Sequence, residues 1–104
     1  MNDSGWIQCP LSSGTLLGSN WVYARQKGNH VVISGLFSPT SSPLIWDLPE
    51  EITPPSINIG CTAVNAAFNL AQMAILSGDP RILVNQIQAV SGQYAFNMSY
   101  YTGA

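Results

Sequence analysis

Charged side chains are scarce in this chain. Asp, Glu, Lys and Arg make up 8% of its 104 residues, against roughly 25% in an ordinary soluble domain. The hydrophobic share is ordinary at 46%, and neutral polar residues replace the missing charge, with 12 Ser, 8 Asn, 6 Gln and 5 Thr. Such a surface has little charge-based solubility. It suits a protein that covers part of its surface in an oligomer or that meets a neutral partner such as a glycan.

Positive charge is the rarest kind. Arg25, Lys27 and Arg81 are the only fixed cations, and the isoelectric point is near 4.8. Binding to a phosphate backbone needs clustered basic residues. We therefore expect no nucleic-acid partner.

A membrane-spanning segment is also missing. The stretch from Ile57 to Leu76 carries no charge and is long enough to cross a bilayer. Four amide side chains interrupt it, and each would be costly in lipid: Asn58, Asn65, Asn69 and Gln72. We expect no membrane insertion. The N-terminal MNDSGWIQ has neither a basic region nor an apolar one, so no secretory signal is expected.

Cysteine occurs only at positions 9 and 61. Two cysteines are too few for a disulfide framework, and they lack the spacing of metal ligands. Free cysteine is among the most buried residue types. We therefore expect Cys9 and Cys61 to be small buried thiols, with no metal and no other cofactor.

Two-residue alternation is the dominant pattern. In NWVYARQKGNHVVISGLF, Trp21, Tyr23 and Arg25 share one face, Lys27-Gly28-Asn29 makes a turn, and the pattern resumes to Phe37. This predicts a β-hairpin. SINIGC, RILVNQIQ and QYAFNMSYY also have strand character, and SPTSSP has the composition of a loop. At this length the chain is one domain over residues 1–104.

The segment from Thr62 to Ser77 fits two patterns. Val64, Phe68, Ala71 and Ile75 fall at helical spacing. The same stretch also alternates in steps of two. A lone amphipathic helix would need an apolar face to cover, and the rest of the chain is β in pattern. We therefore predict strand.

The stretch WDLPEEITPP concentrates acidic residues and prolines. A glycosidase needs two carboxyl groups about 5–10 Å apart, one of them with a raised pKa. Glu50 and Glu51 are adjacent, so an extended backbone points them to opposite faces. Asp47 and Glu51 would share a face but lie beside prolines, where solvated charges are the simpler interpretation. We favour an irregular arm without catalytic function, and we expect His30 to be a lone exposed histidine.

Several of these features occur in a familiar order. A short Trp6-Ile7 strand precedes the YARQKGNHVVISG hairpin, Leu48-Pro49 is followed by Pro54-Pro55, a Gly-Asp-Pro-Arg turn separates two strands, and a last strand ends in Ser99-Tyr100. The chain resembles the head domain of receptor-binding and related tail-tip proteins of phages that infect lactic acid bacteria and other Gram-positive hosts. The resemblance implies a compact antiparallel β-sandwich or barrel that forms a homotrimer. It also implies saccharide binding in shallow crevices near the subunit interfaces.

The resemblance suggests site residues as well. Lactococcal members use a histidine and an aspartate two residues apart after an Ala-Phe pair, and the matching AAFNLAQ stretch here holds Asn69 and Ala71. Asn69 can bind a hydroxyl and Ala71 cannot, so the ligand is expected to differ. We expect Trp46 to be the exposed tryptophan and Trp6 and Trp21 to be core. The candidate saccharide-binding residues are Asn69, Trp46, Arg81, Gln72 and Asp47. The neutral set Asn65, Asn69, Gln72, Gln86 and Gln88, with Arg81, could equally line a trimer interface.

The expected function is a non-enzymatic phage tail-tip adhesin that recognises host cell-wall polysaccharide and sits in the virion with other tail and baseplate proteins. Three alternatives remain open. One is a carbohydrate-binding module of a bacterial enzyme, and another is a baseplate or fibre domain that only trimerises. The third is a cell-wall hydrolase.

Overall fold

The regular structure of this protein is entirely β. A computed structural model describes residues 3–102, and within that range there is no helix. The nine strands are β1 Ile7–Gln8, β2 Leu11–Ser13, β3 Trp21–Lys27, β4 His30–Phe37, β5 Leu44–Asp47, β6 Ile59–Val64, β7 Leu70–Ile75, β8 Arg81–Ile87 and β9 Tyr94–Tyr101. The all-β prediction is confirmed, as is the hairpin of β3 and β4, which turns at Gly28 and Asn29.

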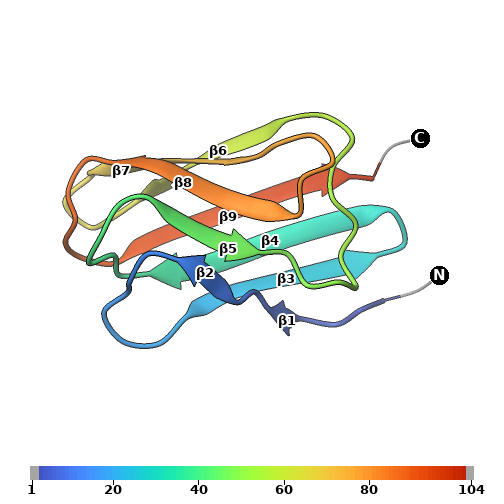
Figure 1. Cartoon of the computed structure of the whole chain (residues 1–104), viewed down its shortest axis with the longest axis horizontal. Helices are drawn as coiled ribbons and strands as arrows, with labels where there is room; N and C mark the ends of the chain where they lie inside the picture. Colours follow the sequence, from blue (N-terminus) through green and yellow to red (C-terminus); the bar gives the residue numbers. More distant parts are fainter. Residues whose placement is uncertain (1–2, 103–104) are drawn as a thin grey trace.

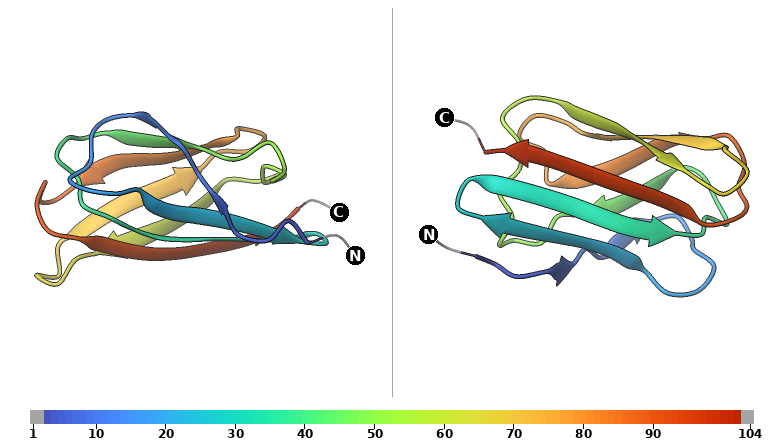
Figure 2. Two further views of the ribbon diagram at one scale, coloured as in Figure 1. Left: turned by 90° about the horizontal axis from the view of Figure 1, so that it is seen from below. Right: turned by 180° about the vertical axis from the view of Figure 1, so that it is seen from behind.

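The strands form one antiparallel sheet in the order β1-β3-β4-β9-β6-β7-β8-β5-β2. The sheet curls so that β1, β3, β4 and β9 face β6, β7, β8, β5 and β2 across the core (Figures 1 and 2). The bend lies between β9 and β6, which share a single registered pair, Val64 with Ala95. This compact half-barrel agrees with the predicted sandwich or barrel class.

The N-terminal segment joins the two edges of the sheet. β1 pairs with β3 in one layer and β2 pairs with β5 in the other, and only Cys9 and Pro10 separate the two strands. Cys9 is fully buried at this crossing, and burial raises the pKa of its thiol to about 12. Cys61 is half-buried, and both cysteines are free. The expectation of a buried thiol therefore holds fully for Cys9 and partly for Cys61.

Alternation along each strand supplies the core. In β9, every second side chain from Tyr94 to Tyr100 is buried and those between are exposed. Phe37 lies at the centre, with its ring centroid 5.5 Å from that of Tyr94 and 5.2 Å from that of Trp46. Aromatic rings at these separations attract one another beyond simple area burial. The two layers therefore meet through a shared aromatic cluster.

The predicted exposure of Trp46 is wrong. Its side chain is fully buried, and the indole Nε1 donates a hydrogen bond to Asn20 Oδ1 at 3.0 Å. The physical reason is that β5 continues to Asp47, so Trp46 has the inward parity of Leu44. The remainder of WDLPEEITPP is an irregular connection, as expected, with Glu50 and Glu51 exposed.

That connection is nevertheless anchored to the body of the protein. Leu48, Ile52 and Pro55 are buried. The Tyr100 hydroxyl donates to the Thr53 carbonyl at 2.6 Å, and burial raises the pKa of Tyr100. The segment therefore closes the core between β5 and β6, which a solvated arm would not do.

The segment from Thr62 to Ser77 is strand, as predicted, but it forms two strands with a turn between them. β6 ends at Val64 and β7 begins at Leu70. The Asn65 amide donates to the Asn69 carbonyl at 3.2 Å, and the Phe68 amide donates to the Asn65 carbonyl at 3.0 Å. These bonds form a tight loop that the sequence pattern did not reveal.

Candidate functional site

The structure does not bring all five predicted site residues together. Asp47 and Arg81 are opposite one another in the β5–β8 register. Arg81 itself donates to Asp79, at 2.9 Å from Nε and 2.8 Å from Nη2. The Asp79 carboxylate raises the pKa of Arg81, and Arg81 lowers that of Asp79. Arg81 thus belongs to an ion pair of the β7–β8 turn.

Asn69 and Gln72 lie away from that pair. Asn69 is in the β6–β7 loop, and its carboxamide oxygen accepts a hydrogen bond from the Asn65 side chain at 3.2 Å. Gln72 is exposed on β7, opposite Gln86 of β8. Arg81 is the first residue of β8, whereas Leu70, next to Asn69, accepts a hydrogen bond from the Gln88 amide just beyond the last residue of that strand. With Trp46 in the core, these five residues form no common surface.

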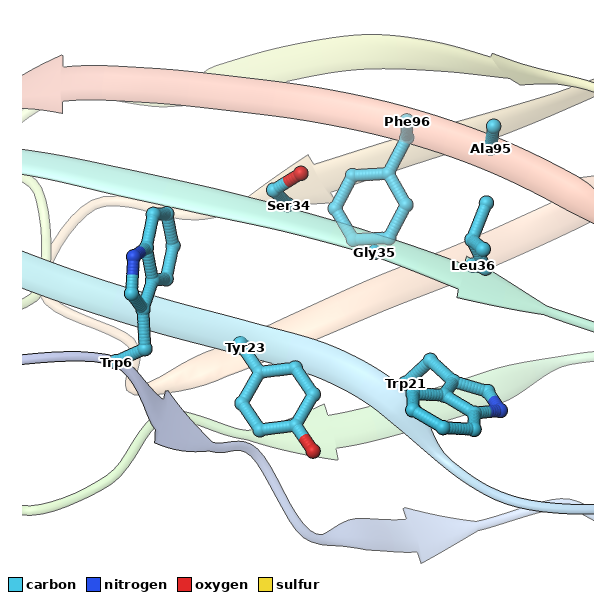
Figure 3. Close-up of a pocket in the computed structure, with 8 residues that line it drawn as sticks. All are labelled: Trp6, Trp21, Tyr23, Ser34, Gly35, Leu36, Ala95 and Phe96. Atoms are coloured by element: carbon cyan, nitrogen blue, oxygen red, sulfur yellow. The ribbon is translucent and has the colours of Figure 1, made fainter.

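A different group of side chains does gather on one face, which we call the aromatic face. It is the outer surface of β1, β3, β4 and β9, and it is centred on Trp6, Trp21 and Tyr23 (Figure 3). Trp6 is 51% exposed and Trp21 is 53% exposed, so the prediction that both are core residues is wrong. The three rings border a shallow depression of about 520 Å³.

Strand parity explains why these rings point outward. In β3, Val22 and Ala24 are fully buried, and Trp21 and Tyr23 take the other side. Trp21 lies opposite Leu36 of β4, and Tyr23 lies opposite Ser34. The small residues fill the thin space beneath β3, because the core volume is already taken by the aromatic cluster around Phe37. Large rings on a solvent-facing sheet surface are unusual enough to indicate a contact surface.

The floor of the depression requires glycine. Gly35 pairs with Val22 on one side and with Phe96 on the other. A Cβ at this position would lie 2.9 Å from the Trp21 carbonyl oxygen and 2.9 Å from the Val22 Cα. The close approach of β3 and β4 therefore depends on Gly35.

Trp6 is held in place by the residues that precede it. The Arg25 guanidinium binds the Asp3 carboxylate through two nitrogens, with Nε donating at 2.9 Å. The Ser4 amide donates to the Gln26 carbonyl at 2.9 Å, and Ser4 Oγ accepts from the Gln26 amide at the same distance. Arg25 lowers the pKa of Asp3 to about 2. We call residues 3–6 the N-terminal strap.

Polar groups border the rings. Ser34 lines the depression, Gln8 is opposite Tyr23, and Asn97 is opposite Ser34. The lining residues include no carboxylate, imidazole or thiol. Across residues 3–102, no group of three or more His, Cys, Asp or Glu side chains is arranged to hold a metal ion. The arrangement is suited to stacking and hydrogen bonding.

No protein-family model, curated protein or solved structure matches this chain. In the described residues there is also no helix long and apolar enough to cross a membrane.

Proposed function

We propose that this chain is a non-catalytic saccharide-binding domain and that the aromatic face is its binding surface. The observation that supports this most directly is the pair of half-exposed tryptophans, Trp6 and Trp21, beside a shallow depression on the outer face of the sheet. Ligand sites are typically concave and mostly apolar, with a few polar groups that fix orientation. The depression has this composition.

The chemistry of a sugar ring matches such a surface. One face of a pyranose carries C–H groups that pack on an indole or phenol ring, and its edge carries hydroxyls. Tyr and Trp offer an apolar body with a polar tip. Ser34, Gln8 and Asn97 would meet hydroxyls, since Ser, Asn and Gln can both donate and accept. Asp3 and Arg25, which lie beside the rings, are bound to each other. Lys27 is exposed at the end of β3, beyond the residues that line the depression, so the lining itself favours a neutral saccharide.

The biological setting that we propose follows from the family resemblance. In this setting the domain would act as a phage tail-tip adhesin that binds host cell-wall polysaccharide and is assembled with other tail proteins in the virion. A homotrimer would give three weak sites on one particle. Weak single contacts then add up to firm attachment through multivalency.

A second candidate function is a purely structural trimerising domain of a baseplate or fibre. The observation that favours it is an uncharged stretch on the outer face of β6, β7 and β8, where Thr62, Gln72 and Gln86 are exposed on adjacent strands. Burying a neutral face costs less than burying charges. In that case the aromatic face would be covered by a neighbouring copy. A carbohydrate-binding module of an enzyme would use the aromatic face as proposed, but as a monomer.

Binding to host cell-wall polysaccharide fragments tests the proposal. Trp21→Ala removes a half-exposed ring, and we expect affinity to fall roughly tenfold to a hundredfold, because a buried large side chain contributes about 1.5–3 kcal/mol. Tyr101→Ala is the matched control, since Tyr101 is an exposed aromatic at the far end of the same face. Light scattering on the same samples gives the oligomeric state.

Two outcomes would contradict the proposal. One is a wild-type protein that binds none of the fragments while forming a stable trimer, which is the result expected of a structural domain. The other is an equal loss of affinity in the Trp21 and Tyr101 variants, which would place the sugar away from the depression. Release of soluble sugar from host walls would instead indicate a hydrolase.

A further inference from the structure

Charge is distributed very unevenly along the long axis of the molecule. The four connections at one end are residues 14–20, 38–43, 65–69 and 88–93, and we call this the loop end. It lies on the left in Figure 1, with both ends of the described chain at the opposite end. None of these connections contains a charged residue. All eight charges lie in the other half: Asp3, Arg25, Lys27, Asp47, Glu50, Glu51, Asp79 and Arg81.

Apolar side chains project from the loop end. Phe68, in the β6–β7 loop, is 83% exposed, and Leu17, in the β2–β3 loop, is 72% exposed. Val90 of the β8–β9 loop is 43% exposed and lines a depression together with Leu17. Asn65 links two of these loops, because its side-chain nitrogen donates to the Ser91 carbonyl at 3.3 Å. The three projections therefore belong to one surface.

The loop that carries Phe68 is built to hold it outward. Phe68 has φ of +62°, a left-handed conformation that non-glycine residues seldom adopt and that tends to persist where it serves a function. Asn65 Oδ1 accepts from the Ala67 amide at 3.1 Å and from the Asn69 amide at 2.8 Å. With the amides of Asn65 and Phe68 bonded within the same loop, four of its five amide groups have partners inside it.

We infer that the loop end docks on the surface of a lipid bilayer with neutral headgroups, through Phe68, Leu17 and Val90. Apolar side chains and aromatic rings are favourable at the boundary between headgroups and acyl chains. A backbone that enters this region must have its polar groups satisfied, and the Phe68 loop largely meets that condition. The contact is peripheral, so no segment crosses the membrane.

The charge pattern selects among lipid surfaces. Anionic membranes attract clusters of Lys and Arg, and the loop end has none. Docking it therefore removes no ion from water. Separate projections also suit a deformable layer, which fills the space around each side chain, better than a protein surface, which would need a matching socket for each.

Flotation with phosphatidylcholine vesicles tests this inference. We expect the wild-type protein to float with the vesicles equally at low and high salt, because no charge takes part. Phe68→Asn should lower the partition coefficient roughly tenfold. Asparagine is well suited to this position, since it tolerates the left-handed conformation, so this variant retains its fold. Leu17→Asn and Val90→Asn should weaken binding further when combined with it.

Ile57→Asn is the matched control, since Ile57 is 67% exposed at the opposite end, and it should leave flotation unchanged. The inference is overturned if wild-type protein does not float, or if Phe68→Asn floats as well as wild type. It is equally overturned if Phe68→Asn only abolishes a self-association seen by light scattering, because the surface is then a contact between copies. Saccharide binding should be the same in Phe68→Asn and wild type, so each proposal can fail without the other.

Discussion

Replacing Asn65 with alanine should destabilise the protein by loosening two neighbouring loops. Asn65 is the one polar residue that is buried in residues 3–102. Its side chain accepts two amide hydrogen bonds, from Ala67 and Asn69, and donates to the Asn69 carboxamide and the Ser91 carbonyl. It therefore holds both the β6–β7 loop and the neighbouring β8–β9 loop.

The magnitude follows from these bonds. A typical intramolecular hydrogen bond contributes about 0.5–1.5 kcal/mol net. The loop is partly open to water, which can satisfy some of the freed groups, so Asn65→Ala should cost about 2–3 kcal/mol. For a domain of this size, that corresponds to a fall in Tm of roughly 10–20 °C. Asn69→Ala removes a single side-chain bond and should cost less than about 1 kcal/mol.

Urea denaturation followed by tryptophan fluorescence measures both variants. The protein carries three tryptophans, one of them in the core, so the signal reports global unfolding. We expect the urea midpoint to be highest for wild type, lower for Asn69→Ala and lowest for Asn65→Ala. The dependence of the unfolding free energy on urea concentration should be similar for all three. Equal midpoints for Asn65→Ala and wild type would refute the view that this side chain organises the loop.

Two further predictions concern the aromatic face. Gly35→Ala should lower stability by about 1–3 kcal/mol, because the added methyl would lie 2.9 Å from the Val22 backbone; Gly60→Ala, whose nearest neighbour would be 3.5 Å away, is the control, and thermal unfolding measures both. Arg25 holds the pKa of Asp3 at about 2, below its usual value of 3.8, so the stability from this pair is complete above about pH 4 and is lost as the pH falls towards 2. Melting curves of Asp3→Asn should lack that acid-dependent loss, and an identical pH profile in the variant and wild type would contradict the assignment.

Most strands were predictable because alternation is a local property. The β3–β4 hairpin, the irregular connection after Asp47 and the strand character of β8 and β9 all follow from neighbouring residues. The turn between β6 and β7 was not predictable in the same way. Its left-handed position holds Phe68 in place of glycine, and its closure depends on Asn65, whose role requires a side chain that folds back on its own loop.

The candidate site was missed for a related reason. Alternation separates two faces of a strand but does not say which face is inside. The sequence showed that Val22 and Ala24 lie on one face of the strand and Trp21 and Tyr23 on the other. The large area of an aromatic ring favoured the face with the rings as the buried one. The core is instead filled by an aromatic cluster in which Phe37 of β4 contacts Tyr94 and Phe96 of β9 and Trp46 of the other layer. The sequence did hold a signal: small apolar side chains on one face of a strand and large aromatic rings on the other are compatible with the small residues facing a core that leaves little room.

The crossing at Cys9 and Pro10 has a consequence for how the molecule behaves among its copies. An open sheet ends in two unpaired backbone rows, each of which can template strands from another chain. Here β1 pairs with β3 and β2 pairs with β5, and both of these edge strands are very short. Residues 7–13 therefore pair with the outermost long strand at each edge of the sheet. Because this protein has little charge to keep copies apart, it depends on these short edge strands to prevent strand pairing between molecules.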